Sequence, residues 1–324
     1  IERGVAGMPT ALTATYGSGK PVIAILGEFD ALPMISQKQY ATTHDPVVEG
    51  GPGHGCTHNT MATAGVAAAI AVKRAMDEYN IKGTVRFYGS PAEETLISRP
   101  YMVDAGLFDD VDAVIDNHGG GSFGSSYGIS GTGMYSFLVT FTGKTGHAAS
   151  PWTGRSALDG VELMNIGTNF LREQLHFSSR MHYVIIEGGE APNVMPDKAT
   201  VWYFLRGSDD MLDEMFQKVL DCAKGAALMS GTDYEVKILT GIHQSYKNKV
   251  LAETYQKNIE QVGMPEWTEE EQNFVKELQK QLGYSPTGLR TEVSKLGTPP
   301  AVFTGGGSTD VGTVSLYRPT ATIS

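Results

Sequence analysis

The sequence predicts an α/β protein with a mostly parallel, helix-covered sheet and an inserted ferredoxin-like βαββαβ domain. In residues 1–130, short apolar runs alternate with a helical stretch, and polar residues follow each run. Residues 131–243 instead read as strand, helix, strand, strand, helix, strand. We therefore expect one domain made of residues 1–130 and 244–324, interrupted by a second domain at residues 131–243.

The first domain is predicted from three apolar runs and one helix. Residues 21–33 predict a buried strand that ends in a loop, and residues 83–90 and 111–121 predict two more strands. Between them, residues 60–79 predict a helix whose small side chains allow close packing on the sheet. In such sheets ligands bind beyond the carboxyl ends of the strands.

The inserted domain is predicted from six elements in the order named above. Strands are expected at 134–144, 181–189, 198–207 and 233–241, and helices at 157–175 and 209–230. Helical patterns return after Asn248. Residues 299–312 (PPAVFTGGGSTDVG) and the extended run RPTATIS at the end then predict a return to the sheet.

The composition excludes several classes of partner. A net charge of −11 argues against a nucleic-acid surface, which needs a basic face. The longest apolar stretch, residues 62–72, is too short to cross a bilayer, so we expect no membrane partner. Two cysteines in 324 residues cannot form a disulfide framework, which favours a reducing compartment and a cytoplasmic location.

Residues 53–59, GHGCTHN, place a cysteine between two histidines. Cys56 and His58 are both good ligands for a zinc-type cation, and His54 fits better as a residue that supports the loop. A buried thiol with a capping histidine is the plain structural alternative. A second alternative is a Cys56 nucleophile with His58 or His54 as its base and Asp30 orienting that base.

Three further groups follow predicted strands. Glu93 and Glu94 are adjacent, so one carboxylate can bind a metal while the other acts as a general base on water. His118 supplies another candidate ligand, and Asp30 can orient a ligand histidine, although a turn or helix cap would also explain it. A metal site accounts for all of these residues, whereas a cysteine nucleophile leaves Glu93, Glu94 and His118 unexplained.

Several long motifs carry a family resemblance over nearly the whole chain. They are GKPVIAILGEFDALP, GPGHGCTHN, GSPAEET, TGKTGHAASPW, APNVMPDKA and GGGSTDVG. The chain resembles the co-catalytic metallopeptidase and amidohydrolase superfamily of aminoacylases, dipeptidases and glutamate carboxypeptidases. Within it, the chain is most similar to the branch of amidohydrolases that resemble the B subunit of p-aminobenzoyl-glutamate hydrolase.

The resemblance implies a role for each residue of the predicted metal centre. Cys56 would bridge two divalent cations, zinc or manganese. His58, Glu94 and His118 would be further ligands, Asp30 would orient a ligand, and Glu93 would be the general base. The implied reaction is hydrolysis of the amide bond of an N-acyl amino acid or dipeptide-like substrate with a free carboxylate, such as p-aminobenzoyl-glutamate.

The resemblance also implies that the inserted domain is a lid through which two chains form a homodimer. His147 would reach the active site of the partner chain and stabilise the oxyanion. Asn193 and Arg206 would bind the substrate carboxylate, which the planar fork of arginine suits. Taken alone, His147 and Arg206 are equally consistent with ordinary surface residues.

Two departures from the family pattern leave other functions open. Thr57 stands where the family usually has a glycine, so the backbone there is strained or the loop differs. The family's last metal-binding histidine follows the segment that matches RPTATIS, but no histidine follows His243 in this chain. We expect the chain to be part of a longer protein. Alternatives are a non-catalytic binding or scaffold protein with a depleted metal site, and a metal-free cysteine hydrolase.

Overall fold

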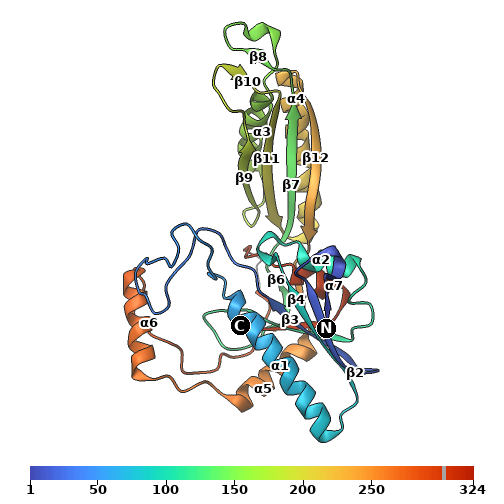
Figure 1. The fold of residues 1–324 in the computed structure, drawn as a ribbon, viewed down its shortest axis with the longest axis vertical. Coiled ribbons are helices and arrows are strands. Elements are labelled where there is room, and N and C mark those ends of the chain that lie inside the picture. Colours follow the sequence, from blue (N-terminus) through green and yellow to red (C-terminus); the bar gives the residue numbers. More distant parts are fainter. Residues whose placement is uncertain (301–303) are drawn as a thin grey trace. The chain divides into compact units, whose positions relative to one another are not determined.

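The structure, a computed structural model, describes residues 1–300 and 304–324, and these residues form two compact units (Figure 1). Unit 1 contains residues 1–130, 246–300 and 313–324. Unit 2 contains residues 131–245 and, among those described, residues 304–312. Each unit is described below by itself.

Unit 1 is built on an eight-stranded sheet with the order β1-β2-β4-β3-β5-β14-β13-β6. Strands β4, β3, β5, β14 and β13 run parallel, while β1 and β2 are antiparallel to their neighbours. The predicted mostly parallel sheet is therefore confirmed. The strands are β1 Glu2–Arg3, β2 Leu12–Ser18, β3 Val22–Glu28, β4 Gly83–Ser90, β5 Ala113–Asn117, β6 Gly128–Ser130, β13 Ser245–Lys247 and β14 Thr320–Ile323.

The helices of unit 1 include one long helix, α1, which packs on β3 and β4. A Cβ atom added at Gly65 of α1 would lie 2.9 Å from the carbonyl oxygen of Leu26 and from the ring of Phe87. The small side chains of α1 thus permit the close packing that the sequence predicts. The helices are α1 His58–Tyr79, α2 Ser98–Asp104, α5 Lys249–Val262, α6 Glu269–Gln281 and α7 Val311–Tyr317, with a short 3₁₀ turn, η2, at Glu93–Thr95.

Unit 2 has a four-stranded antiparallel sheet with the order β12-β7-β11-β9, which is the ferredoxin-like order. Helices α3 and α4 pack against each other and against the sheet, and their apolar faces share one core with the strands. The elements are β7 Gly133–Thr142, α3 Ala157–Leu171, β9 Arg180–Glu187, β11 Lys198–Gly207, α4 Asp209–Ser230 and β12 Asp233–Ile242. Two short strands, β8 Gly146–His147 and β10 Val194–Met195, form a separate ribbon.

The expected return to the sheet near the end of the chain is correct only in part. Residues 320–323 form β14, which pairs in parallel with β5. Of the predicted segment 299–312, residues 301–303 lie outside the described residues, and residues 304–309 form no strand. Three consecutive glycines, Gly305–Gly307, explain this, because glycine is depleted in strands. In the described part of the chain, no helix combines the length and apolar character that a bilayer crossing requires.

Candidate metal centre

The parallel strands of unit 1 bring the predicted polar residues to one edge of the sheet. Glu28 at the end of β3 pairs in register with Ser90 at the end of β4, and β5 runs alongside β3 in the same direction. The loop after β3, the turn after β4 and the turn after β5 therefore start at the same edge. These three segments carry Asp30, the pair Glu93–Glu94 and His118.

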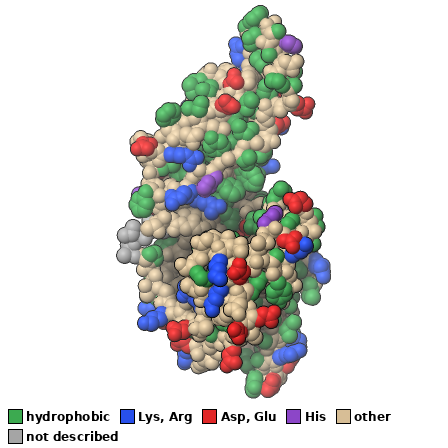
Figure 2. Space-filling view, turned by 90° about the vertical axis from the view of Figure 1, so that its left-hand side faces the viewer, with side chains coloured by type: hydrophobic (Ala, Val, Ile, Leu, Met, Phe, Trp, Pro, Cys, Tyr) green, Lys and Arg blue, Asp and Glu red, His purple; other side chains and the backbone are tan. Residues whose placement is uncertain are grey.

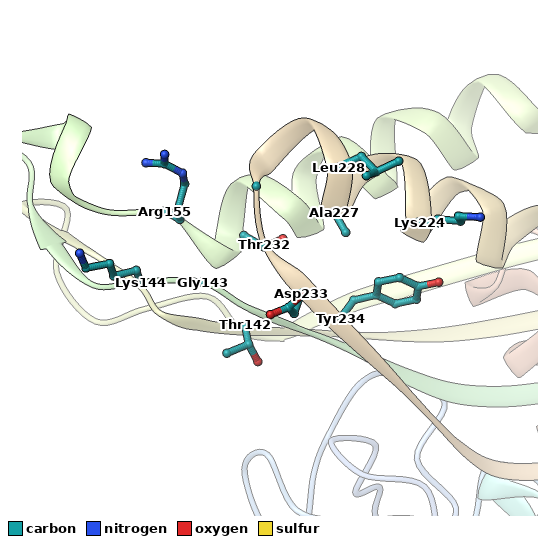
Figure 3. A pocket seen from close by; sticks show the side chains of 11 residues that line it. Thr142, Gly143, Lys144, Arg155, Lys224, Ala227, Leu228, Thr232, Asp233 and Tyr234 are labelled. Carbon is teal, nitrogen blue, oxygen red and sulfur yellow. The ribbon is translucent and has the colours of Figure 1, made fainter.

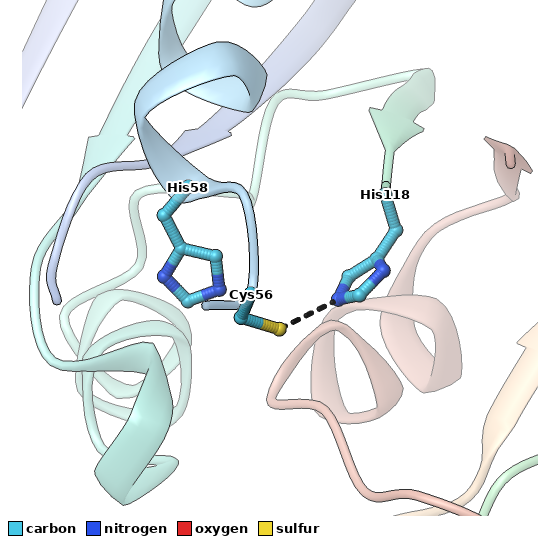
Figure 4. Close-up of side chains that lie close together, drawn as sticks. All are labelled: Cys56, His58 and His118. Atoms are coloured by element: carbon cyan, nitrogen blue, oxygen red, sulfur yellow. Dashed lines mark hydrogen bonds between the residues drawn. The ribbon is translucent and has the colours of Figure 1, made fainter. Parts of the chain in front are cut away.

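Cys56, His58 and His118 form the first of two donor groups (Figure 4). Their ligand atoms all lie within 4.8 Å of one another, and Sγ of Cys56 lies 3.6 Å from Nε2 of His118. Nδ1 of His118 donates to the carbonyl oxygen of Gly119 at 2.9 Å. That bond fixes the tautomer, so the lone pair of Nε2 faces Cys56.

His58 is the first residue of α1, which begins two residues before the predicted start of that helix. Its Nδ1 donates to Oδ1 of Asp30 at 3.0 Å, and Oδ2 of Asp30 accepts from the backbone N–H of Glu94 at 3.0 Å. Burial raises the pKa of Asp30, but these contacts outweigh that effect and leave the pKa lowered. Asp30 thus orients His58 and ties it to the turn after β4.

The structure adds Glu28, which the sequence reading missed, to the site. Glu28 is buried, its Oε1 accepts from Nη1 of the buried Arg99, and its Oε2 lies 3.1 Å from Nε2 of His58. Burial raises the pKa of Glu28, but Arg99 and His58 outweigh it and leave the pKa lowered. An acidic residue inside the apolar run VIAILGE is the sequence signal that could have identified it.

Glu93 and Glu94 approach the same histidine nitrogen from η2. Oε2 of Glu93 and Oε1 of Glu94 lie 3.8 Å and 3.9 Å from Nε2 of His58. Glu93 forms the second donor group with Glu28 and His58, and all three are buried. Glu94 is less buried, and burial raises the pKa of its carboxyl group.

The donor set suits a divalent cation. A thiol and two imidazoles are the ligands that zinc-type ions prefer, and carboxylates lie next to them. Nε2 of His58 is buried and lies 3.1 Å from Oε2 of Glu28, with Glu93 and Glu94 at 3.8 Å and 3.9 Å, so carboxylates surround this nitrogen and could share a cation with it. Burial and the nearby Glu94 raise the pKa of Cys56 in the metal-free chain, which is unfavourable for a free thiolate nucleophile.

Thr57, between two candidate ligands, has the left-handed conformation that favours glycine. Its φ and ψ are 64° and 18°. Its side chain lies against Gly119, where an added Cβ atom would be 2.0 Å from Oγ1 of Thr57. The departure from the family pattern is therefore a strained threonine that fits over a glycine next to His118.

In unit 2 the structure brings together two of the three predicted residues. His147 pairs in register with Val194, next to Asn193, and the backbone N–H of Ala148 donates to the carbonyl oxygen of Asn193 at 3.0 Å. Arg206 lies near the other end of β11, opposite Arg180 of β9. Eight residues of strand separate Lys198 from Arg206, about 26 Å, so Arg206 does not share a site with His147 within one chain.

A groove of unit 2, drawn in Figure 3, is not lined by His147, Asn193 or Arg206. Its volume is about 570 Å³, and it lies between the end of β7, the last turns of α4 and the start of β12. Lys144, Arg155 and Lys224 line it, and all three are exposed. Exposed lysines and arginines around a groove do not by themselves define a ligand site.

The fold and the donor groups define an α/β protein of the two-unit metallohydrolase type. Residues 24–310 match the Peptidase family M20/M25/M40, and the chain belongs to this family. The family expected from the sequence motifs is thereby confirmed.

Two curated relatives are similar in sequence. The B subunit of the p-aminobenzoyl-glutamate hydrolase of Escherichia coli (strain K12) is 41% identical over 286 residues, which cover 87% of this chain and 59% of that protein. The Xaa-Arg dipeptidase of Mus musculus is 30% identical over 272 residues, which cover 80% of this chain and 58% of that protein. The chain thus spans less than two thirds of the length of these relatives.

Two solved structures share the fold. An aminobenzoyl-glutamate utilization protein from Klebsiella pneumoniae has a TM-score of 0.62 and 19% identity, covering 98% of this chain and 70% of that chain. A dinuclear metal binding peptidase from Bacillus subtilis has a TM-score of 0.58 and 19% identity, covering 98% of this chain and 76% of that chain.

Proposed function

We propose that this chain is part of a metal-dependent amidohydrolase that cleaves the amide bond of an N-acyl amino acid or dipeptide-like substrate. The observation that carries the proposal is the Cys56–His58–His118 donor group with Glu93 beside it. In our proposal, the ligands of two zinc or manganese ions are Cys56, His58, His118 and Glu94. Such ions lower the pKa of water and polarise a carbonyl group when bound.

In this proposal the carboxylate of Glu93 is the general base. It is buried and lies at the edge of the donor group, where it can take a proton from water and return it to the leaving amine. Asp30 holds His58 in one orientation through the bond to Nδ1. Glu28, which is held by Arg99, closes the buried side of the site.

The proposed substrate carries a free carboxylate. In unit 2, burial lowers the pKa of His182, and a cluster of three arginines, Arg206, Arg172 and Arg180, lowers it further. Such a cluster suits an anion. The names of the relatives, a component of an aminobenzoyl-glutamate hydrolase and a dipeptidase, favour a small acyl amino acid such as p-aminobenzoyl-glutamate.

We further propose a homodimer formed through unit 2. Strand β9 is an edge of the four-stranded sheet and exposes four consecutive apolar side chains, residues 183–186. Phe170 and Ile166 on α3 are also exposed, and Figure 2 shows hydrophobic side chains on the surface of this unit. An apolar edge strand is a template for pairing with another chain. In such a dimer, His147 of one chain would act in the site of the partner.

The test combines metal reconstitution with one variant. The protein, prepared at full length, is freed of metal, reloaded with zinc or manganese and assayed on p-aminobenzoyl-glutamate, N-acetyl amino acids and dipeptides. Glu93→Gln is expected to keep its metal content and lose about 10²–10⁴ in turnover. Glu78→Gln, at an exposed position of α1, is the matched control and should resemble wild type.

Each other outcome contradicts the proposal in a different way. Near-normal turnover of Glu93→Gln would remove Glu93 from its role. Loss of activity with iodoacetamide but not with chelators would indicate a cysteine hydrolase. Failure to bind metal or to hydrolyse any substrate would favour a binding or scaffold protein.

A further inference from the structure

Unit 1 contains a cavity that has no role in the proposed reaction. Its volume is about 620 Å³, and it lies between the turn that follows β5 and the region around α6. We call it the α6 pocket. One wall is the turn 120–123, and the other includes Met264, Trp267 and Leu289. Its volume is in the range of small-molecule sites.

The α6 pocket begins next to the candidate metal centre. Gly120, in its wall, is two residues from His118, which limits their separation to about 7 Å. The turn is attached to the end of the sheet, because the N–H of His118 donates to the carbonyl oxygen of Ile323 and the N–H of Gly124 to that of Ser324, both at 2.9 Å. The pocket therefore starts beyond the carboxyl ends of the parallel strands β5 and β14, where such folds bind ligands.

The lining of the α6 pocket suits a flat apolar group. Phe123, Met264, Trp267 and Leu289 contribute apolar surface. The indole N–H of Trp267 donates to the carbonyl oxygen of Arg290 at 2.7 Å, so its polar atom is satisfied and its ring is held in place. On the opposite wall, glycines leave the backbone accessible to a ring.

We propose that the α6 pocket binds the acyl group of the substrate and selects aromatic acyl groups. This proposal rests on the proposed function. It places the scissile amide at the group formed by Cys56, His58 and His118, and the acyl group in the α6 pocket, past the turn 119–121. The pocket then acts as the specificity-determining site for the acyl side of the bond.

The test measures binding and not turnover. Glu93→Gln protein loaded with metal is titrated calorimetrically with N-benzoyl-glutamate and with N-acetyl-glutamate. Burying a phenyl ring favours the benzoyl ligand by about 10- to 100-fold in Kd. Gly121→Leu, which enlarges a residue that lines the pocket, should abolish this preference. A Cβ atom at Gly121 meets no atom within 4 Å, so the variant should fold.

A matched control and a second variant complete the test. Gly225→Leu, on α4, also adds a Cβ atom to open space and should keep the preference. Trp267→Ala should reduce the benzoyl preference, because it removes the indole ring from the pocket. An unchanged preference in Gly121→Leu and Trp267→Ala would overturn the pocket assignment. If the preference and its loss are seen but no substrate is hydrolysed, the pocket stands and the proposed function fails.

Discussion

Sγ of Cys56 lies 3.6 Å from Nε2 of His118, although 62 residues separate them in the chain. Cys56 comes from the loop before α1, and His118 from the turn after β5. A pair of soft donors at this separation can bind one cation together, with His58 as the third donor.

The first prediction concerns the two cysteines. Cys56→Ser is expected to reduce the number of zinc ions bound per chain, because it removes the sulfur ligand. Cys222→Ser, in α4 of unit 2, is the matched control and should bind as many ions as wild type. Elemental analysis after gel filtration measures both. Equal metal content in the two variants would exclude Cys56 as a ligand.

The second prediction concerns Asp30. Asp30→Asn keeps the size of the side chain but removes its negative charge. In the wild-type chain one carboxylate oxygen accepts from Nδ1 of His58 and the other accepts from the backbone N–H of Glu94. We expect a 10- to 100-fold loss of zinc affinity, as is typical of such partners. Competition with a chromogenic chelator measures it. Asp45→Asn, whose carboxylate pairs with Lys38 at the surface, should have wild-type affinity. Equal affinities of the two variants would count against the orienting role.

The third prediction is a pH dependence of the metal-free chain. Burial lowers the pKa of His58, but Asp30 and Glu28 outweigh it and raise the pKa to about 11, from 6.5. A raised pKa contributes stability that is complete below pH 6.5 and is lost as the pH rises through about 11. With a chelator present, the free energy of unfolding of the wild type should therefore fall between pH 6.5 and about 11, and it should fall more than that of His58→Asn. Urea unfolding at several pH values tests it, and parallel curves would contradict it.

The fourth prediction compares the two edges of the sheet in unit 2. Strand β9 exposes only apolar residues over positions 183–186, whereas β12 exposes the charged Asp233, Glu235 and Lys237, which protect an edge. Ile186→Lys should shift the chain from dimer to monomer in analytical ultracentrifugation. Ile238→Lys on β12 is the matched control, since Ile238 is 52% exposed and Ile186 53%. A shift in both variants, or in neither, would argue against pairing through β9.

The elements that sequence predicts best are those with local end signals. Strand β11 and helix α4 have the predicted bounds, 198–207 and 209–230. Ser208 precedes α4, and Gly231 ends it in the left-handed conformation that glycine adopts readily. The convergence of the polar residues that follow β3, β4 and β5 was also predictable, because parallel strands end at one edge of the sheet.

The pairing of Glu28 with Arg99 and the separation of Arg206 from His147 could not be predicted in the same way. Glu28 is stable in a buried strand because Arg99, 71 residues later, pairs with it, and no local pattern reveals such a partner. Arg206 pairs with Met134 near the start of β7, whereas His147 lies in the separate β8–β10 ribbon that follows the end of β7. The order of strands along the chain does not specify this pairing. Both features depend on tertiary structure.

The last prediction concerns the contact between Thr57 and Gly119. Gly119→Ala would place a Cβ atom 2.0 Å from Oγ1 of Thr57, and we expect it to lower the free energy of unfolding by about 1–3 kcal/mol. Thr57→Gly removes the opposing group and the strained left-handed threonine, so the double variant should recover most of the loss. Gly121→Ala, which meets no atom within 4 Å, is the control.

A double-mutant cycle by urea unfolding measures this coupling. If Gly119→Ala destabilises the chain equally with threonine and with glycine at position 57, Thr57 is not the group that Gly119 accommodates. A large coupling would show that the threonine and the glycine are fitted to each other. Because Cys56 precedes Thr57 and His118 precedes Gly119, the same contact would then set the spacing of the two donors. In that case Gly119→Ala should also lower zinc affinity, and Thr57→Gly should restore it.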